Sequence, residues 1–534
     1  MTNTPEASAF KLNRRGFLGL GAAAGIVASL AACSPSSSGS GTPSGSAPAA
    51  NADGVITAAI SDELNADYDP FNTTAALTMA ANWHVFEGLT EVDLATREAY
   101  PGLGAAMPTK IDDTTYEVKL RDGAVFHDGT KVTVDDVVFS YQTATQSKSP
   151  VATFIKVITG ITKKDDSTVT IKLAYPLSVI GQRLSVLKIA PQAAYSKDPK
   201  AFALAPIGSG PYKMTDNGAG SKKVVFERND AYTGTRKAMA KKMEWQLIKD
   251  DATRTNALQS GTVQAIDSVP IANLATLAPK KVAAQQGFNL VFAMFNFSTP
   301  MGKDLNVRKA VMSALDYDKI VKTGMGDLAT PATCFVYEGH PAYKKASATY
   351  ENQAAKAKEL VAALPSKKLN VVAANHPWWA GVRPIIKESL TAAGFEVNFR
   401  EVASADIYNK IIPTEPQGYD VVFAPGDPSP WGIDADVLLR WWYANDLWTD
   451  TRIHWKGEAS YTKAQELIDS AAKASGDEQM KLWHETFDLL SENLPLYPIF
   501  HRKVPTGWDD QTLTNFKPIA VPGLSFIGVG STKK

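Results

Sequence analysis

The fold is decided by the stretch Lys368–Ala424, which reads KLNVVAANHPWWAGVRPIIKESLTAAGFEVNFREVASADIYNKIIPTEPQGYDVVFA. Short apolar runs alternate in it with segments of helical periodicity. In chain order, strands and helices are expected at Lys368–Ala373, Gly381–Ala393, Phe395–Arg400, Ala405–Ile412 and Tyr419–Ala424. Gly394 follows the first helix, where glycine commonly ends one. Because strands that alternate with helices pair in parallel, the sequence predicts an α/β lobe with helices on the faces of a sheet.

Further helices and strands are expected on both sides of this lobe. The segment Leu305–Thr323 has apolar residues at helical spacing and is expected to end at Gly324. The sequence Thr133–Asp136 is a capping box that opens another helix. Other helices are expected at Leu77–Glu87, Ala354–Leu364, Ser460–Lys473 and Gln479–Asn493, and strands at Val55–Ile60, Thr115–Leu120, Thr168–Leu173 and Val224–Glu227.

Two extended apolar segments, Leu290–Phe297 and Leu496–Val504, are candidates for crossing between lobes. A chain of 534 residues is long enough for two or three domains. Two lobes that are joined by a pair of strands form a hinge, which can close around a ligand.

The segment Asn13–Cys33 has the pattern of an export signal, with paired Arg14 and Arg15, an apolar run and small residues before the cysteine. The arginine pair is typical of twin-arginine signals. The last four residues resemble a bacterial lipobox, in which the cysteine receives lipid and becomes the first residue of the mature protein. The alternative is an ordinary apolar helix with a chance cysteine. We expect a signal peptide at residues 1–32 and a lipid anchor at Cys33.

Residues 33–53 are expected to form a flexible tether, because Ser34–Asn51 consists almost entirely of Ser, Gly, Pro and Ala. Beyond the tether, no apolar run is long enough to span a bilayer. We therefore expect an extracytoplasmic protein that is held at the cell membrane by its lipid and can reach a membrane partner.

Composition narrows the range of partners. The formal net charge is zero, so the chain has no global electrostatic attraction to nucleic acid or to an anionic membrane surface. Of the two cysteines, only Cys334 remains as a thiol if Cys33 is lipidated. No intrachain disulfide is then expected.

Several motifs in the chain resemble the family 5 extracellular solute-binding proteins, which include the oligopeptide-, dipeptide- and nickel-binding receptors of ABC importers. The first motifs are EGLTEVD at Glu87–Asp93, YEVKLRDGAVFHDGTKVTVDDVVFSYQ at Tyr116–Gln142 and PIGSGPY at Pro206–Tyr212. Further matching segments are Asn229–Val269, Phe295–Phe297 with Val307–Ala310, and Pro495–Pro498. The resemblance covers nearly all of the chain after the tether.

The resemblance implies an α/β periplasmic-binding-protein-like fold with two lobes, an inserted subdomain in the first lobe and a two-strand hinge. Lobe I is expected at residues 54–294, with its insert near 99–205. Lobe II is expected at 295–504, and residues 505–534 return to lobe I. The resemblance also implies a monomer that captures a small solute, with an oligopeptide expected, and delivers it to an ABC permease in the membrane. No cofactor or metal is implied.

The loop Pro425–Gly432 follows the strand at Tyr419–Ala424, and ligands of open α/β sheets bind beyond the carboxyl ends of the strands. In this loop Asp427 offers a carboxylate and Trp431 a flat apolar face. In the peptide-binding members of the family, an aspartate after a glycine at this place pairs with the ligand's amino terminus, and Gly426 with Asp427 matches that position. The other interpretation is that Asp427 only caps the turn that it begins.

In the first lobe, Tyr68, Trp83 and His84 are candidate ligand contacts, because they correspond roughly to ligand-facing segments of the family. The commoner role of a histidine such as His84 is structural. Seven of the eleven tryptophans lie between Trp378 and Trp455. Their faces can stack on a ligand or, more simply, fill the core of the second lobe.

Catalytic motifs are missing from the sequence: it contains no Gly-x-Ser-x-Gly, His-Glu-x-x-His or Gly-x-x-x-x-Gly-Lys. The seven histidines are scattered, which argues against a preassembled zinc site but permits a nickel chelate that is bound as a whole. We therefore expect a binding protein and not an enzyme. The alternatives that stay open are an oligosaccharide or metal-chelate receptor of the same fold, and a surface hydrolase or signalling receptor that uses the cleft.

Overall fold

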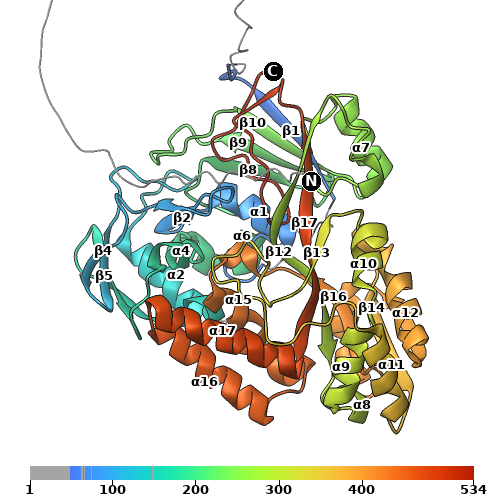
Figure 1. The fold of residues 1–534 in the computed structure, drawn as a ribbon. Coiled ribbons are helices and arrows are strands. Elements are labelled where there is room, and N and C mark those ends of the chain that lie inside the picture. Colours follow the sequence, from blue (N-terminus) through green and yellow to red (C-terminus); the bar gives the residue numbers. More distant parts are fainter. Residues whose placement is uncertain (1–48, 62–63, 65–66, 74, 147–149) are drawn as a thin grey trace, which may run out of the picture. The chain divides into compact units, whose positions relative to one another are not determined.

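The computed structural model describes residues 49–61, 64, 67–73, 75–146 and 150–534. The expected signal peptide, the lipid-anchor position Cys33 and most of the expected tether lie outside these residues. Figure 1 gives the arrangement of the helices and strands.

The main sheet has eleven strands in the described part of the chain, in the order β15-β14-β16-β12-β17-β11-β1-β10-β9-β8, and β13 pairs separately with β17. The strands are β1 (Val55–Ile60), β8 (Tyr212–Asn217), β9 (Lys223–Arg228), β10 (Lys242–Leu247), β11 (Ala265–Ile266), β12 (Lys281–Phe295), β13 (Ala329–Pro331), β14 (Lys368–Ala374), β15 (Glu396–Val402), β16 (Val421–Gly426) and β17 (Leu496–Trp508). The long strands β12 and β17 are paired at its centre (Figure 1).

The pair β12 and β17 connects two halves of the sheet. Residues Lys281–Gln286 of β12 pair with Lys503–Trp508, whereas Leu290–Met294 pair with Leu496–His501. The second half of β12 also pairs with β16. The antiparallel register shifts just after Gln286, where the strand passes from one half of the sheet to the other. A pair of strands with a local irregularity at the crossing is the two-strand hinge that the sequence predicts.

Lobe II contains the βαβ arrangement that was predicted from Lys368–Ala424. Strand β14 pairs in parallel with both β15 and β16. Helix α12 (Val382–Ala393) joins β14 to β15 and ends at Gly394, whose φ of +105° suits glycine. The remaining helices of this part are α8 (Pro300–Lys303), α9 (Leu305–Ala314), α10 (Tyr317–Lys319), α11 (Ala354–Ala363), α13 (Ser404–Asp406), α14 (Ile412–Thr414), α15 (Ala435–Tyr443), α16 (Ala459–Lys473) and α17 (Gly476–Asn493).

The prediction of one continuous helix over Leu305–Thr323 is wrong. Helix α9 ends at Ala314, and Leu315 is extended. The carboxylate of Asp316 then accepts a hydrogen bond from the backbone N–H of Lys319 and caps the short α10. By capping α10, Asp316 favours a new helix start over continuation of α9. The spacing of apolar residues does not reveal such a break.

Lobe I contains the other half of the main sheet and an insert with a sheet of its own. The insert sheet has the order β4-β5-β7-β6. The elements of lobe I outside the main sheet are α1 (Ala76–Val85), β2 (Thr90–Val92), β3 (Ala99–Pro101), β4 (Thr109–Asp112), β5 (Thr115–Lys119), α2 (Val134–Gln146), α3 (Pro150–Ile155), β6 (Ile158–Lys163), β7 (Thr168–Leu173), α4 (Ile180–Ser185), α5 (Gln192–Lys197), α6 (Pro199–Leu204), α7 (Asp251–Gln259), β18 (Leu513–Thr514) and β19 (Gly530–Ser531). The predicted capping box at α2 is present, because Thr133 and Asp136 each accept a hydrogen bond from the other's backbone N–H.

The two lobes have largely separate hydrophobic cores. One buried cluster extends in sequence from Phe288 to Phe500 and surrounds the β14–β16 half of the sheet. A second cluster extends from Ile56 to Ala265 and resumes at Leu513. Val437 on α15 is a buried lobe II residue that packs in the second cluster, and the partly buried Trp431 and Trp441 of lobe II also pack against it. The cores therefore meet at α15.

Helix α15 of lobe II is attached to the insert by a buried ion network. Arg183 on α4 is 2% exposed and lies 3.1 Å from a carboxylate oxygen of Asp434 and 3.2 Å from one of Asp436. Arg440 lies 2.7 Å from the other oxygen of Asp436. Phe154 on α3 stacks against Trp441, with ring centroids 5.7 Å apart. The chain itself therefore connects the lobes at β12 and β17, and side-chain contacts connect the insert to α15.

Candidate functional site

A cavity of about 730 Å³ lies where lobe I meets the loop after β16. Most of its lining comes from lobe I: helix α1, the hairpin β2–β3, the loop between β9 and β10, and the carboxyl-terminal segment around residues 515–529. Pro430 and Trp431 supply the lobe II part of the wall. A volume of this size lies within the range of small-molecule sites in proteins.

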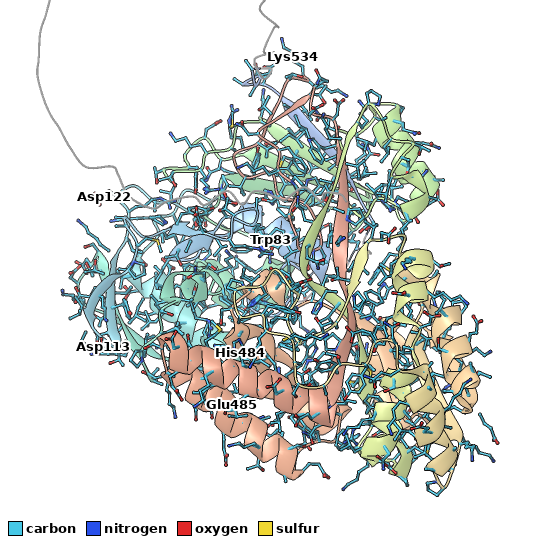
Figure 2. All side chains as sticks on the ribbon, in the orientation of Figure 1. Trp83, Asp113, Asp122, His484, Glu485 and Lys534 are labelled. Atoms are coloured by element: carbon cyan, nitrogen blue, oxygen red, sulfur yellow. The ribbon has the colours of Figure 1, made fainter. Side chains whose placement is uncertain are left out.

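Helix α1 brings Trp83 to the cavity. Its neighbours on the helix are buried, whereas Trp83 is only partly buried and lines the cavity together with Met79 and Asn82. Figure 2 places Trp83 in the middle part of the structure. Each lobe thus supplies one flat aromatic face to the cavity: Trp83 comes from lobe I and Trp431 from lobe II.

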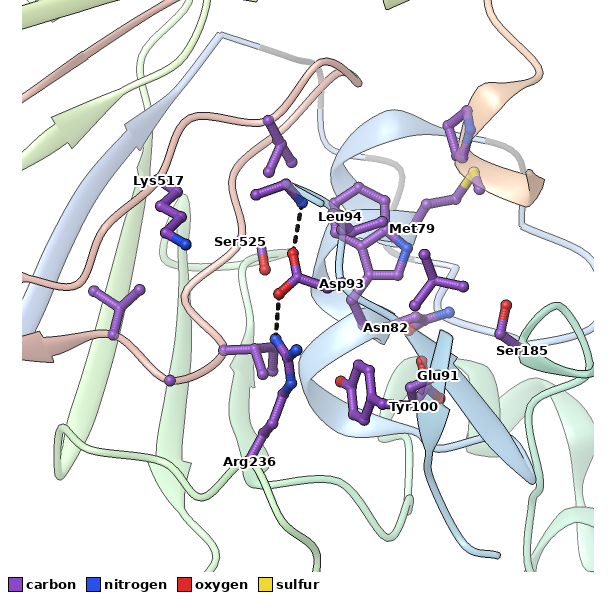
Figure 3. A pocket seen from close by; sticks show the side chains of 18 of the residues that line it. Met79, Asn82, Glu91, Asp93, Leu94, Tyr100, Ser185, Arg236, Lys517 and Ser525 are labelled. Carbon is purple, nitrogen blue, oxygen red and sulfur yellow. Dashed lines mark hydrogen bonds and ion pairs between the residues drawn. The ribbon is translucent and has the colours of Figure 1, made fainter. Parts of the chain in front are cut away.

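Two ion pairs lie in the lobe I wall. Asp93 and Arg236 are 2.5 Å apart, and the Arg236 guanidinium lies 4.2 Å from the centre of the Tyr100 ring (Figure 3). Glu91 is 2.7 Å from Lys188. Burial raises the pKa of Glu91, although Lys188 opposes the shift. For Asp93, burial acts upward but hydrogen bonds from Arg236 and the backbone outweigh it, so its pKa lies below the ordinary value.

Asp427 lies one residue beyond the end of β16, in the loop that carries Pro430 and Trp431, but it is not among the residues that line the cavity. Its Oδ1 accepts a hydrogen bond of 2.9 Å from the backbone N–H of Ser429, so the turn-capping interaction considered above is present. Its Oδ2 is shielded from solvent and has no hydrogen-bond partner in the described part of the chain. Capping the turn therefore uses only one of the two carboxylate oxygens.

Asp427 is surrounded by polar groups, and some of their atoms have no hydrogen-bond partner in the described part of the chain. Burial raises its pKa to about 6, while Ser429, Arg97 and Asn289 act in the opposite direction. Arg97 belongs to the turn between β2 and β3 in lobe I, and its Nη1 lies 3.5 Å from the carbonyl oxygen of Ser429. The Oγ of Ser429 and the Oδ1 of Asn289 have no partner among the described residues. Buried polar atoms without partners mark a place where a ligand or water can be bound.

The structure places Tyr68 and His84 in the core of lobe I, and neither lines the cavity. The Tyr68 hydroxyl donates to the carbonyl oxygen of Asn217 at 2.8 Å. The His84 Nε2 accepts a hydrogen bond from the backbone N–H of Phe526, which leaves Nδ1–H to donate to Ala80 O. Burial lowers the pKa of His84 to about 4, so the ring is neutral at pH 7. Both side chains have structural partners.

The tryptophans divide between core and cavity. Trp379, Trp442 and Trp455 are fully buried, and Trp448 nearly so. Trp431 is different, because it lines the cavity and also stacks on Phe154 of the insert, with ring centroids 5.0 Å apart. Of the five candidate contacts, Trp83 and Trp431 lie on the cavity wall, whereas Asp427 does not line the cavity and belongs to the loop that carries Trp431.

Sequence reasoning missed the charged part of the cavity. The hairpin β2–β3 supplies Glu91, Asp93 and Tyr100, and the loop between β9 and β10 supplies Arg236. The motif Glu87–Asp93 indicates the family but gives no sign of a charged cavity wall. Asp93 and Arg236 are 143 positions apart, so no local spacing links them.

A second hollow of about 360 Å³ lies along α17 and includes His484 and Glu485, which Figure 2 shows on the outer helices. Its lining is mostly charged and contains no Trp, Tyr or Phe among the described residues. No helix within the described ranges is long and apolar enough to cross a membrane. The part of the chain that the structure describes also holds no group of three His, Cys, Asp or Glu residues suited to a metal ion.

Comparison with known proteins identifies the family. The model of the bacterial extracellular solute-binding proteins, family 5 Middle, matches residues 98–456. A putative ABC transporter peptide-binding protein of Brucella ovis is 27% identical over 364 residues, which are 65% of this chain and 68% of that protein. The glutathione-binding protein GsiB of Salmonella typhi is 25% identical over 482 residues, which are 86% of this chain and 91% of that protein.

The solved structure of the binding protein AgaA from A. tumefacien R10, in complex with agropinic acid, has a similar fold. Its TM-score is 0.78 at 23% identity, with 90% of this chain and 99% of that chain covered. This similarity supports the two-lobed fold alone. Because the family model spans more than half of the sequence, the chain belongs to family 5 of the bacterial extracellular solute-binding proteins.

Proposed function

We propose that this protein is the receptor of an ABC importer, and that it binds a short peptide with a free amino terminus and delivers it to a membrane permease. Asp427 carries the proposal, because its Oδ2 is shielded, lacks a hydrogen-bond partner among the described residues and belongs to the loop that supplies Pro430 and Trp431 to the cavity wall. A peptide ammonium group can supply the missing donors. The relatives support this choice, since one is described as peptide-binding and the other as binding glutathione, a tripeptide.

The proposed mechanism is closure of the lobes on the ligand. Asp427 and Trp431 come from lobe II, whereas Trp83 comes from lobe I, and β12 with β17 joins the two. A ligand that contacts both lobes binds the closed form more tightly than the open form and shifts the population toward it. The permease then recognises the closed form. No step alters the peptide, so peptides recovered from the protein are expected to be intact, and cleaved products would contradict the binding role.

The first prediction concerns the amine anchor. Asp427→Asn keeps an oxygen that can cap the turn but removes the charge, so it should weaken binding of a tripeptide library by about 2–5 kcal/mol, as for loss of one partner of a buried charge pair. Amino-terminal acetylation of the library should have a similar effect on the parent. Calorimetry measures both. Asp446→Asn is the control, because Asp446 lies in the same lobe and its side chain is 74% exposed. Equal affinity of parent and Asp427→Asn for the free peptides would refute the anchor.

The second prediction concerns pH. The pKa of Asp427 is raised to about 6, so in the ligand-free protein this group becomes neutral as the pH falls through 6. A peptide ammonium group stays charged in this range and pairs with the ionised form only. Affinity should therefore fall between pH 7 and pH 5, approaching tenfold per pH unit at the acid end. The dependence should disappear in Asp427→Asn, and a flat profile in the parent would contradict the role of the carboxylate.

The third prediction concerns attachment to the membrane, which we propose occurs through lipid on Cys33 after export by a twin-arginine signal. The protein would then act as a lipid-anchored monomer outside the cytoplasm. Cys33→Ala should move it from the membrane fraction to the soluble extracytoplasmic fraction on immunoblots. Cys334→Ala is the matched control, since Cys334 is buried in lobe II. Retention of Cys33→Ala in the membrane would disprove lipid anchoring at this residue.

A further inference from the structure

Arg236 is held in the cavity wall with most of its hydrogen-bonding capacity unused. Its Nη1 donates to Asp93 at 2.5 Å, and its guanidinium lies over the Tyr100 ring. Nε and Nη2 make no hydrogen bond to any described residue, and 37% of the side chain is exposed. An arginine has five N–H donors in a planar fork, so one bond to Asp93 leaves most of them available.

Asp93 acts as a fixed support for this arginine. Its Oδ1 accepts hydrogen bonds from the backbone N–H groups of Ala95, at 2.9 Å, and Thr96, at 3.0 Å, while Oδ2 is bound by Arg236. Asp93 is thus oriented by its own turn before it contacts the arginine. With Tyr100 on one face and Asp93 at one edge, the guanidinium has few orientations left (Figure 3).

The charged lining of the cavity has a basic excess. Its acidic residues are Glu91 and Asp93, and its basic residues are Lys188, Arg236, Lys237 and Lys517. Glu91 is paired with Lys188. Lys237 and Lys517 are exposed and form no ion pair with any residue that the structure describes. The cavity lining therefore contains an arginine with unused N–H donors and two lysines without ion-pair partners, which are available to a ligand.

We propose that Arg236 binds a carboxylate of the ligand, with Lys237 and Lys517 adding attraction, so that the protein selects ligands with an anionic group. Guanidinium and carboxylate form two parallel hydrogen bonds, which fix orientation as well as charge. Asp427 of lobe II would bind the amine of the ligand, and Arg236 of lobe I would bind its carboxylate. This inference rests on the proposed function and narrows the ligand class to short peptides with a free carboxyl terminus or an acidic side chain.

The competing role for Arg236 is structural, as a clamp between the β9–β10 loop and the β2–β3 hairpin. A clamp would affect all ligands alike. A carboxylate-binding residue affects only ligands that carry the carboxylate, so the two roles are separated by changing the residue and the ligand together.

The test uses a tripeptide library without acidic side chains, prepared as free acids and as carboxyl-terminal amides, and the same library with one glutamate. Binding is measured for the parent, Arg236→Gln and Arg236→Lys. Arg228→Gln is the matched control, because Arg228 lies on the preceding strand β9, pairs with Asp230 and does not line the cavity. Thermal unfolding confirms that each variant is folded. Glutarate is titrated in parallel as a carboxylate that is not a peptide.

The parent should bind free acids at least tenfold more tightly than amides, and glutamate should restore part of the loss in the amides. Arg236→Gln should remove this preference while its affinity for neutral amides stays within about twofold of the parent, and Arg236→Lys should restore it only partly. Equal binding of acids and amides by the parent, or equal loss of both in Arg236→Gln, would overturn the proposal. If no peptide binds, the peptide function fails. The carboxylate site then stands if glutarate binds the parent and not Arg236→Gln, and falls otherwise.

Discussion

The pairing of β12 with β17 is the constraint on which the rest of the structure depends. One half of β12 is hydrogen-bonded into lobe I and the other half into lobe II, with the register shift between them. Backbone hydrogen bonds in a sheet are directional, so the two halves hold the sheets of both lobes in a defined relation. The irregular step after Gln286 is the natural place for bending.

On the far side of the cavity the lobes are connected only by side chains in the described part of the chain. Arg183 of the insert contacts Asp434 and Asp436, and Phe154 stacks on Trp431. Trp431 also lines the cavity, so the aromatic contact and the proposed ligand site share one residue. A buried ion network of this kind adds little net stability but penalises separation of its partners. The strands keep the lobes joined at one end, while the side-chain contacts at the other end can separate. This arrangement would allow the lobes to open and close.

The sequence predicts the fold better than it predicts the site. The βαβ unit, the capping box and the stop at Gly394 follow from local periodicity and local chemistry, and they are confirmed. The amino-terminal half of β12 was missed, because its polar residues give no apolar run. Trp83 and His84 are both candidates from the sequence, but Trp83 lines the cavity, whereas His84 is fully buried and bonded to the backbone of Phe526 and Ala80. Arg236 and Asp93 meet through tertiary structure alone, which no sequence pattern encodes.

Closure on a ligand requires the two lobes to move about β12 and β17. Small-angle X-ray scattering of the mature protein, before and after saturation with a peptide shown to bind, measures this movement most directly. The account predicts a smaller radius of gyration in the bound protein, and no change when the same peptide is added to a variant that does not bind it. An unchanged radius of gyration with the peptide bound would contradict closure of the lobes.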